Sequence, residues 1–118
     1  MIARSHSFTI KGEKFTVEFP NIGQLIDIES LKQAMTNNRY GAMAASGIAS
    51  MYHALDAVDA IVFFQVVCPS VLLFLRAKDF SSLSQDTSKE LVEVYKDQIL
   101  PWYSGVMKEL YDAAGEQK

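Results

Sequence analysis

The sequence has one cysteine, Cys68, and only two histidines, His6 and His53. A single thiol cannot form an internal disulfide, and a zinc site needs three or four His, Cys or carboxylate ligands. Cys68 lies in an apolar run beside Pro69, without a basic neighbour that would favour a reactive thiolate, so we expect a buried side chain. The sequence predicts neither a metal site nor a bound cofactor.

Clustered positive charge is also missing. The net charge is -3 and the sequence pI is about 5.3, whereas a nucleic-acid-binding protein usually carries a basic stripe. The N-terminal residues 1–6 lack the apolar core of a signal peptide. Residues 60–75 form a nearly all-apolar run without charge, but this run is shorter than the roughly 20 residues of a membrane span and contains Gln65 and Pro69. We therefore expect a cytoplasmic protein that binds neither nucleic acid nor membrane, with this run at its centre.

Familiar catalytic motifs are absent from the sequence. Gly41 and Gly47 do not form a phosphate loop, and no nucleophile elbow is found. His53, Asp56 and Asp59 fall within two turns of a predicted helix. They could form a weak metal or acid–base site, or the hydrated edge of a buried helix, and the two aspartates could contact a partner. We predict a protein that is not an enzyme.

Residues 5–20 have the alternation of a β-hairpin. Five large apolar residues alternate with polar ones on both sides of a polar link: Phe8, Ile10, Phe15, Val17 and Phe19. A two-residue loop at Gly12–Glu13 would pair Lys11 with Lys14 and Ile10 with Phe15. All five apolar residues would then share one face.

Helical patterns follow from residue 21 to residue 114. Asn21 and Gln24 predict a capping box for a helix that ends in the turn-forming residues 36–39. A second helix should run from about 40 to 67, with a small-residue first half suited to close packing on a helix or another subunit. Its two glycines make a break near Gly47 an alternative. Pro69 should stop or kink it, and residues 70–77 could be a short buried helix or a strand, with leucine favouring the helix.

A last helix is expected after the polar residues 78–87, with Thr87 and Glu90 as its capping box. One apolar stripe keeps its phase across Pro101, which favours a kinked helix over two separate ones, and Gly115 is a natural stop. The stripe contains Leu91, Tyr95, Ile99, Trp102, Val106 and Leu110. Aromatic residues crowd this helix, and they are either core side chains or anchors for a partner: Tyr95, Trp102, Tyr103 and Tyr111.

Together these patterns predict an α+β, mostly α-helical fold. An N-terminal hairpin (5–20) would pack on a bundle of about three to four helices (21–114), forming one domain over residues 1–118. Candidate partner-binding residues are the four aromatic residues of the last helix together with Asp56 and Asp59.

The segment FTIKGEKFTVEFPNIGQLIDIESLK, a hairpin that leads through a proline into an amphipathic helix, resembles small proteins of tailed bacteriophages, in particular the tail assembly chaperones. LKQAMTNNRYGAM, with its Thr/Asn turn before Tyr40 and Gly41, is similar to segments of phage structural proteins. The resemblance covers about the first seventy residues, and Pro101 and Trp102 have no counterpart in it.

The resemblance implies a protein of the host cytoplasm that coats the tape-measure protein and helps to recruit tail or portal components. It also implies a homo-oligomer and supplies no catalytic residues. The alternative is a structural component, such as a connector, tail or cargo protein, that is retained in the virion.

Overall fold

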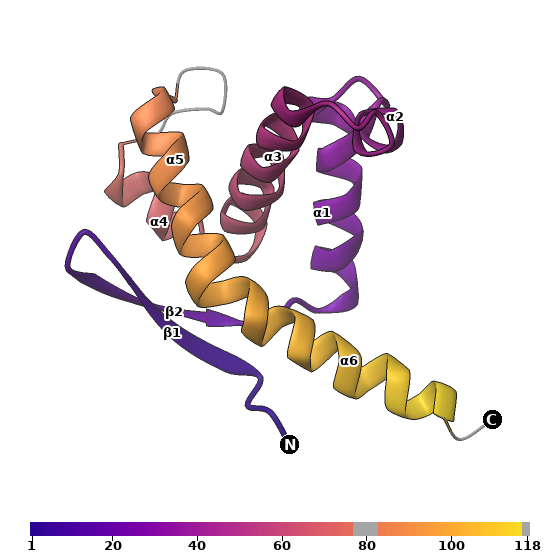
Figure 1. The fold of residues 1–118 in the computed structure, drawn as a ribbon. Helices are drawn as coiled ribbons and strands as arrows, with labels where there is room; N and C mark the ends of the chain where they lie inside the picture. The colour runs from indigo at the N-terminus through magenta and orange to yellow at the C-terminus, as the bar shows by residue number, and fades with distance from the viewer. Residues whose placement is uncertain (77–82, 117–118) are drawn as a thin grey trace. The chain divides into compact units, whose positions relative to one another are not determined.

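The computed structural model describes residues 1–76 and 83–116, with side chains up to Tyr111. The elements in chain order are β1 (Ser5–Ile10), β2 (Glu13–Glu18), α1 (Ile22–Met35), α2 (Tyr40–Ala44), α3 (Ala49–Val67), α4 (Pro69–Phe74), α5 (Gln85–Val94), the π-helical segment η2 (Tyr95–Ile99) and α6 (Leu100–Glu116) (Figure 1). The predicted fold class, α+β and mostly helical with an N-terminal hairpin, is confirmed.

The chain forms two compact units. The first contains residues 1–19 and 93–118, and the second contains residues 20–92. The first unit therefore joins the hairpin to the C-terminal helix from Glu93 onward, and the second contains α1 to α4 and the first eight residues of α5. The prediction of one domain remains a prediction.

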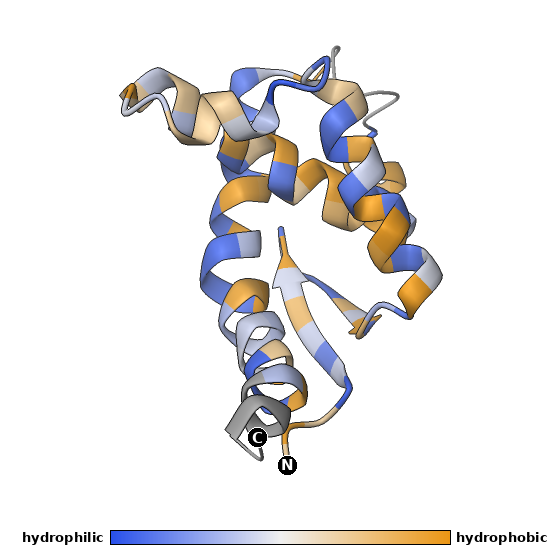
Figure 2. Ribbon diagram, turned by 90° about the vertical axis from the view of Figure 1, so that its right-hand side faces the viewer, coloured by the Kyte–Doolittle hydropathy of each residue, from blue (hydrophilic) through white to orange (hydrophobic). Residues whose placement is uncertain are grey.

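The hairpin forms the β layer of the first unit. Phe8, Ile10 and Val17 are buried on one face, and hydrophobic and hydrophilic residues alternate along the strands (Figure 2). The apolar face is the predicted one, but the predicted register is wrong. Phe8 pairs with Phe15, and Ile10 pairs with Glu13.

The turn explains the difference in register. Lys11 and Gly12 are the two loop residues, with φ of 50° and 80°. Positive φ at both central positions is typical of a type I′ turn, whose twist suits a hairpin. This register avoids placing Lys11 opposite Lys14 and instead stacks the rings of Phe8 and Phe15, with centroids 5.7 Å apart.

The C-terminal helix is unbroken from Gln85 to Glu116, so the prediction of one helix across Pro101 is confirmed. Proline has no N–H, and its ring clashes with the carbonyl four residues earlier. Here the strain is relieved by the wider turn of η2, in which the Leu100 N–H bonds to the Tyr95 carbonyl. The helix continues past Gly115, where a stop was expected.

Two details of this helix's beginning and surface differ from prediction. It starts at Gln85, and the Ser84 Oγ accepts a hydrogen bond from the Thr87 N–H at 3.1 Å. Ser84, not Thr87, therefore satisfies the free amides of the first turn. Leu110, at the end of the predicted apolar stripe, is exposed.

In the second unit, α1 begins with the predicted capping box. The Asn21 Oδ1 accepts from the Gln24 N–H at 2.8 Å, and the Gln24 side chain accepts from the Asn21 N–H at 3.0 Å. The helix ends in the predicted turn, where Asn37 and Asn38 take positive φ, a conformation that asparagine tolerates. α1 and α2 both pack against α3.

The predicted helix from 40 to 67 is two helices, because Gly47, with φ of 71°, separates α2 from α3. The alternative of a break near Gly47 is therefore the observed one. The centre of α3 forms much of the core, with Leu55, Ala60, Ile61, Val62, Phe63 and Phe64 all buried. Among the described residues, α3 is the one helix long and apolar enough to span a membrane. The core helix of a protein can be equally long and apolar, so the prediction that this chain does not bind a membrane remains a prediction.

Cys68 is buried, and Pro69 begins α4. The preferred helix over 70–77 is confirmed as far as Phe74; Ala77 and the connection at 78–82 lie outside the described residues. The prediction that this helix is buried is wrong for Ser70 and for two of its large apolar side chains. Leu73 is 77% exposed and Phe74 is also exposed, whereas Val71 on the same helix is buried.

Candidate functional site

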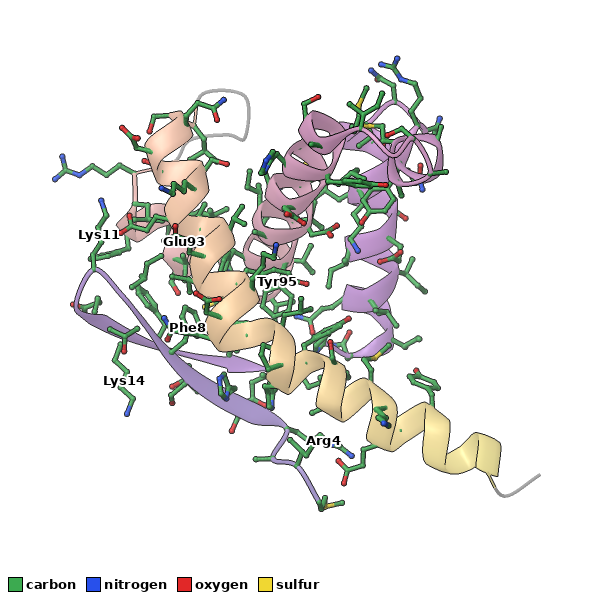
Figure 3. The ribbon with its side chains drawn as sticks, in the orientation of Figure 1. Arg4, Phe8, Lys11, Lys14, Glu93 and Tyr95 are labelled. Carbon is green, nitrogen blue, oxygen red and sulfur yellow. The ribbon has the colours of Figure 1, made fainter. Side chains whose placement is uncertain are left out.

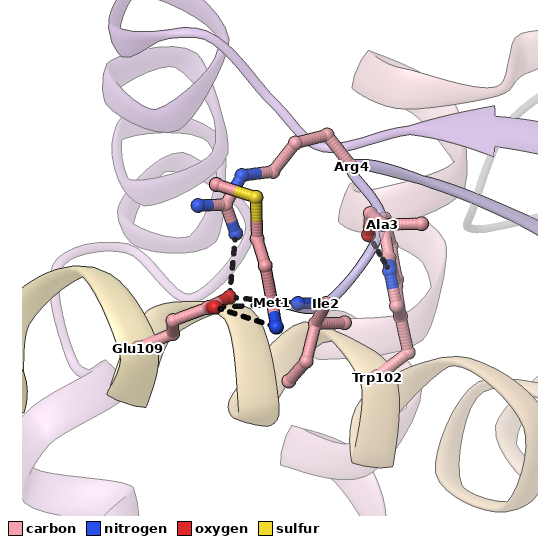
Figure 4. Close-up of polar contacts among 6 residues, drawn as sticks. All are labelled: Met1, Ile2, Ala3, Arg4, Trp102 and Glu109. Atoms are coloured by element: carbon pink, nitrogen blue, oxygen red, sulfur yellow. Dashed lines mark hydrogen bonds and ion pairs between the residues drawn. The ribbon is translucent and has the colours of Figure 1, made fainter.

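Trp102, one of the predicted anchors, is a core side chain of the first unit. It is 8% exposed, and its Nε1 donates a hydrogen bond to the Ala3 carbonyl at 2.8 Å (Figure 4). The His6 ring stacks on it with centroids 5.2 Å apart, and Phe19 meets it edge-on at 5.9 Å. A partner could reach the indole only after these contacts opened.

The other three predicted aromatic residues lie in different settings. Tyr103 is half-buried and stacks on Phe19 with centroids 5.2 Å apart. Tyr95 is half-buried in η2, while Tyr111 is 56% exposed. The structure does not gather these rings into one exposed patch, and Tyr111 is the one with the surface of an anchor.

An ionic contact next to Trp102 holds the N-terminal residues on α6. The Glu109 carboxylate accepts from the Ile2 N–H at 3.1 Å, pairs with Arg4 at 3.2 Å and lies 3.8 Å from the terminal ammonium (Figure 4). The hydrogen bond from the Ile2 amide, with the charges of Arg4 and the terminus, lowers the pKa of Glu109 despite some desolvation. These contacts attach the N-terminal residues to α6 and have a structural role.

Asp59 also serves the structure of its own unit. Its carboxylate accepts a hydrogen bond from the Tyr40 hydroxyl at 2.6 Å and lies 3.6 Å from the Lys32 ammonium. Lys32 also sits over the Tyr40 ring, 5.5 Å from its centroid. Because these groups come from α1, α2 and α3, Asp59 ties the three helices together. A role in partner binding remains a prediction.

His53 and Asp56 face a different neighbour. They line a groove of about 610 Å³ between α3 and α5, together with Asp86 and Lys89. The lining mixes both signs of charge, and in the described chain no group of three or more His, Cys, Asp or Glu could hold a metal ion. The three residues singled out in the sequence are thus divided between a groove and a helix junction.

A second hollow, which the sequence did not predict, lies at the corner between α2 and α3. It has a volume of about 300 Å³ and is lined by Arg39, Ala42, Met43, Ser46 and Met51. Gly47 lies in the connection, and its positive φ lets the chain reverse between the two helices. We call these five lining residues the methionine pocket.

Exposed apolar side chains follow the methionine pocket along the chain. Ile48 is 50% exposed and Tyr52 is 44% exposed, both at the beginning of α3. Methionine is flexible and polarisable, and it is common at surfaces that bind varied apolar partners. The sequence predicted close packing on a helix or another subunit from the small residues of the segment that begins near residue 40. It did not point to Met43 and Met51, the two methionines that lie on either side of Gly47.

Comparison with known proteins finds no matching family model, no similar curated protein and no similar solved structure.

Proposed function

We propose that this chain is a non-enzymatic protein-binding component of tailed-bacteriophage assembly, of the tail-assembly-chaperone type. The methionine pocket is the observation that carries the proposal. It is an open apolar hollow beside exposed Ile48 and Tyr52, on a segment built of small residues. The sequence resemblance of the first seventy residues to tail assembly chaperones supplies the biological setting.

The size of the pocket favours a side chain as its occupant. Its volume of about 300 Å³ is at the lower end of the range for sites that bind small molecules. An amphipathic helix that docks on a groove inserts apolar anchors of this kind. A tape-measure protein, which is long and helical, would offer many such anchors, and flexible methionines would adapt to each.

Where the protein is found in producing cells tests this function. A lysate is separated on a density gradient, and the chain is quantified in each fraction by mass spectrometry. Recovery in light fractions together with tail precursors is expected. Recovery with finished particles at a fixed copy number would instead identify a structural virion component, such as a connector, tail or cargo protein.

A matched pair of variants tests the pocket itself. Met43→Glu places a charge in the methionine pocket and should abolish co-sedimentation with tail precursors. Leu73→Glu introduces the same charge at a side chain that is already 77% exposed on α4, and it should leave co-sedimentation unchanged. Circular dichroism of both variants checks that each remains folded. Equal behaviour of the two folded variants would remove the pocket from the proposal.

A further inference from the structure

The N-terminal strap, as we call Ile2, Ala3 and Arg4, lies along α6 without helix or strand structure of its own (Figure 4). The Trp102 Nε1 donates a hydrogen bond to the Ala3 carbonyl at 2.8 Å. The Ile2 N–H donates to the Glu109 carboxylate at 3.1 Å, and the Arg4 guanidinium pairs with the same carboxylate at 3.2 Å. Arg4 lies beside α6 at the start of the hairpin (Figure 3). The strap and α6 belong to the same unit, so these contacts are internal to it.

The side of α6 that receives the strap has three features on one face. Trp102, Gly105 and Glu109 are three and four positions apart, a spacing that places residues on the same side of a helix. Gly105 has no side chain where Ile2 lies, and a Cβ at this position would be 2.9 Å from the Ile2 Cδ1, so that Ile2 would have to shift. The face is therefore a flat surface between an indole N–H donor and a carboxylate.

Few contacts hold the strap in place. Ile2 is 39% exposed, and the side chains of Arg4 and Glu109 are 39% and 30% exposed. Ion pairs this accessible to water contribute little to stability, and segments with few buried contacts open at a low cost in free energy. The Phe19 N–H bonds to the Arg4 carbonyl at 2.7 Å. The strap can therefore turn about Arg4 while the hairpin stays paired.

An open strap would leave three features of α6 without their present neighbours. In the described structure, every polar contact of the Glu109 side chain is with residues 1–4. The indole N–H of Trp102 would lose its acceptor, and Gly105 would lose the apolar side chain that lies against it. A molecule that takes the place of the strap must therefore supply a carbonyl oxygen, an apolar side chain and a cation within three residues of extended chain.

We propose that this face of α6 binds an extended segment of a partner protein, and that the strap occupies the site in the free protein. The segment carries a large apolar residue and, two positions later, Arg or Lys, which is the pattern of Ile2 and Arg4. The strap is a tethered competitor with a high effective concentration, so only a segment that binds better displaces it. The site shares no residue with the methionine pocket and does not depend on the proposed function.

A peptide with the sequence of residues 1–6, MIARSH, is the probe for this site. Trp102 is the reporter, because it is the only tryptophan. Arg4→Glu places a like charge against Glu109 and should open the strap. In this variant, acrylamide should quench the tryptophan fluorescence more strongly than in the natural chain. MIARSH should bind the variant about tenfold more tightly than it binds the natural chain, whose own strap competes.

Matched chains and a second peptide serve as controls. Arg4→Glu/Glu109→Lys restores opposite charges within the chain, so it should protect the indole and fail to bind MIARSH. Lys108→Glu, the same change in charge at an exposed position on α6, should behave like the natural chain. MIAESH, with Glu in place of Arg, should bind Arg4→Glu about tenfold more weakly than MIARSH does. Circular dichroism checks that each chain is folded, and Arg4→Ala replaces Arg4→Glu if that variant unfolds.

Two results would overturn the proposal. One is unchanged quenching in a folded chain with Arg4 replaced, and the other is MIARSH binding that is absent or equal in the natural chain and the variant. Sedimentation velocity of a mixture of the natural and Arg4→Glu chains tests a second copy as the occupant. The mixture should sediment as its components do alone. A heterodimer would show that the strap of another copy fills the site and would overturn the assignment to a partner protein.

Discussion

Replacement of Trp102 measures how strongly the hairpin and the C-terminal helix are held together in the first unit. The indole contacts His6, Phe19 and Ala3 and is 8% exposed. Burial of roughly 150–250 Å² of aromatic surface at about 25 cal/mol per Å² corresponds to about 4–6 kcal/mol. Residual compactness of the unfolded chain lowers this to about 3–5 kcal/mol, the usual cost of a buried Trp→Ala change.

A smaller replacement separates packing from hydrogen bonding. Trp102→Phe keeps most of the ring burial and loses the hydrogen bond to the Ala3 carbonyl. Because Ala3 is exposed, water can replace that bond, and the cost should be about 1–2 kcal/mol. The Tyr111→Ala variant, at a ring that is 56% exposed, should change stability by less than about 0.5 kcal/mol.

Urea unfolding followed by far-ultraviolet circular dichroism gives the free energy of unfolding of each variant. Fluorescence cannot serve here, because Trp102 is the only tryptophan. A decrease in the free energy of unfolding below about 1 kcal/mol for Trp102→Ala would refute the core position, since removal of a buried indole destabilises a protein by more than this. Such a result would favour an exposed anchor for a partner.

Three further changes test other parts of the structure. Gly105→Ala in α6 should stabilise the protein by up to about 1 kcal/mol and raise the Tm by about 3–6 °C. The new Cβ would lie 2.9 Å from Ile2 Cδ1, which is only the end of a flexible side chain. A lower Tm would show that Ile2 cannot move. Ser84→Ala should lower the free energy of unfolding, measured in urea, by about 1 kcal/mol, and Thr87→Ala should lower it by less. A larger loss for Thr87→Ala than for Ser84→Ala would show that Thr87 is the cap. The lowered pKa of Glu109 means that its stabilising effect is present above the ordinary glutamate pKa, about 4.3, and is lost as the pH falls through the lowered value. Glu109→Gln should therefore destabilise the protein more at pH 7 than at pH 2, and an equal cost at both would exclude the ionic contribution.

The hairpin shows where sequence patterns are sufficient and where they are not. Alternation identified Phe8, Ile10 and Val17 as one face, and all three are buried. The observed and expected registers differ by two residues, a shift that leaves every side chain on the same face. The pattern therefore cannot choose between them. The turn conformation at Lys11 and the stacking of Phe8 on Phe15 favour the observed register.

The helices show the same division between local and distant causes. Asn21 and Gln24 form the predicted capping box, because both partners are three residues apart in the chain. Thr87 fits the same motif but lies one turn inside the helix, where Ser84 caps instead.

The candidate site depended on contacts that no local pattern contains. His53, Asp56 and Asp59 share a stretch of α3, yet Asp59 is held by Tyr40 and Lys32 while the other two line a groove with α5. The methionine pocket likewise needs the reversal at Gly47 to bring its walls together.

The sequence by itself determined the features that depend on neighbours along the chain. These are the apolar face of the hairpin, the cap of α1, the core segment of α3 and the continuity of the helix across Pro101. Only the tertiary structure decided the hairpin register, the burial of Trp102 beneath His6 and Ala3, and the division of the acidic residues. The physical reason is that periodicity and capping act within a few residues, whereas packing and long-range hydrogen bonds join groups up to 107 positions apart, as Ile2 and Glu109 are.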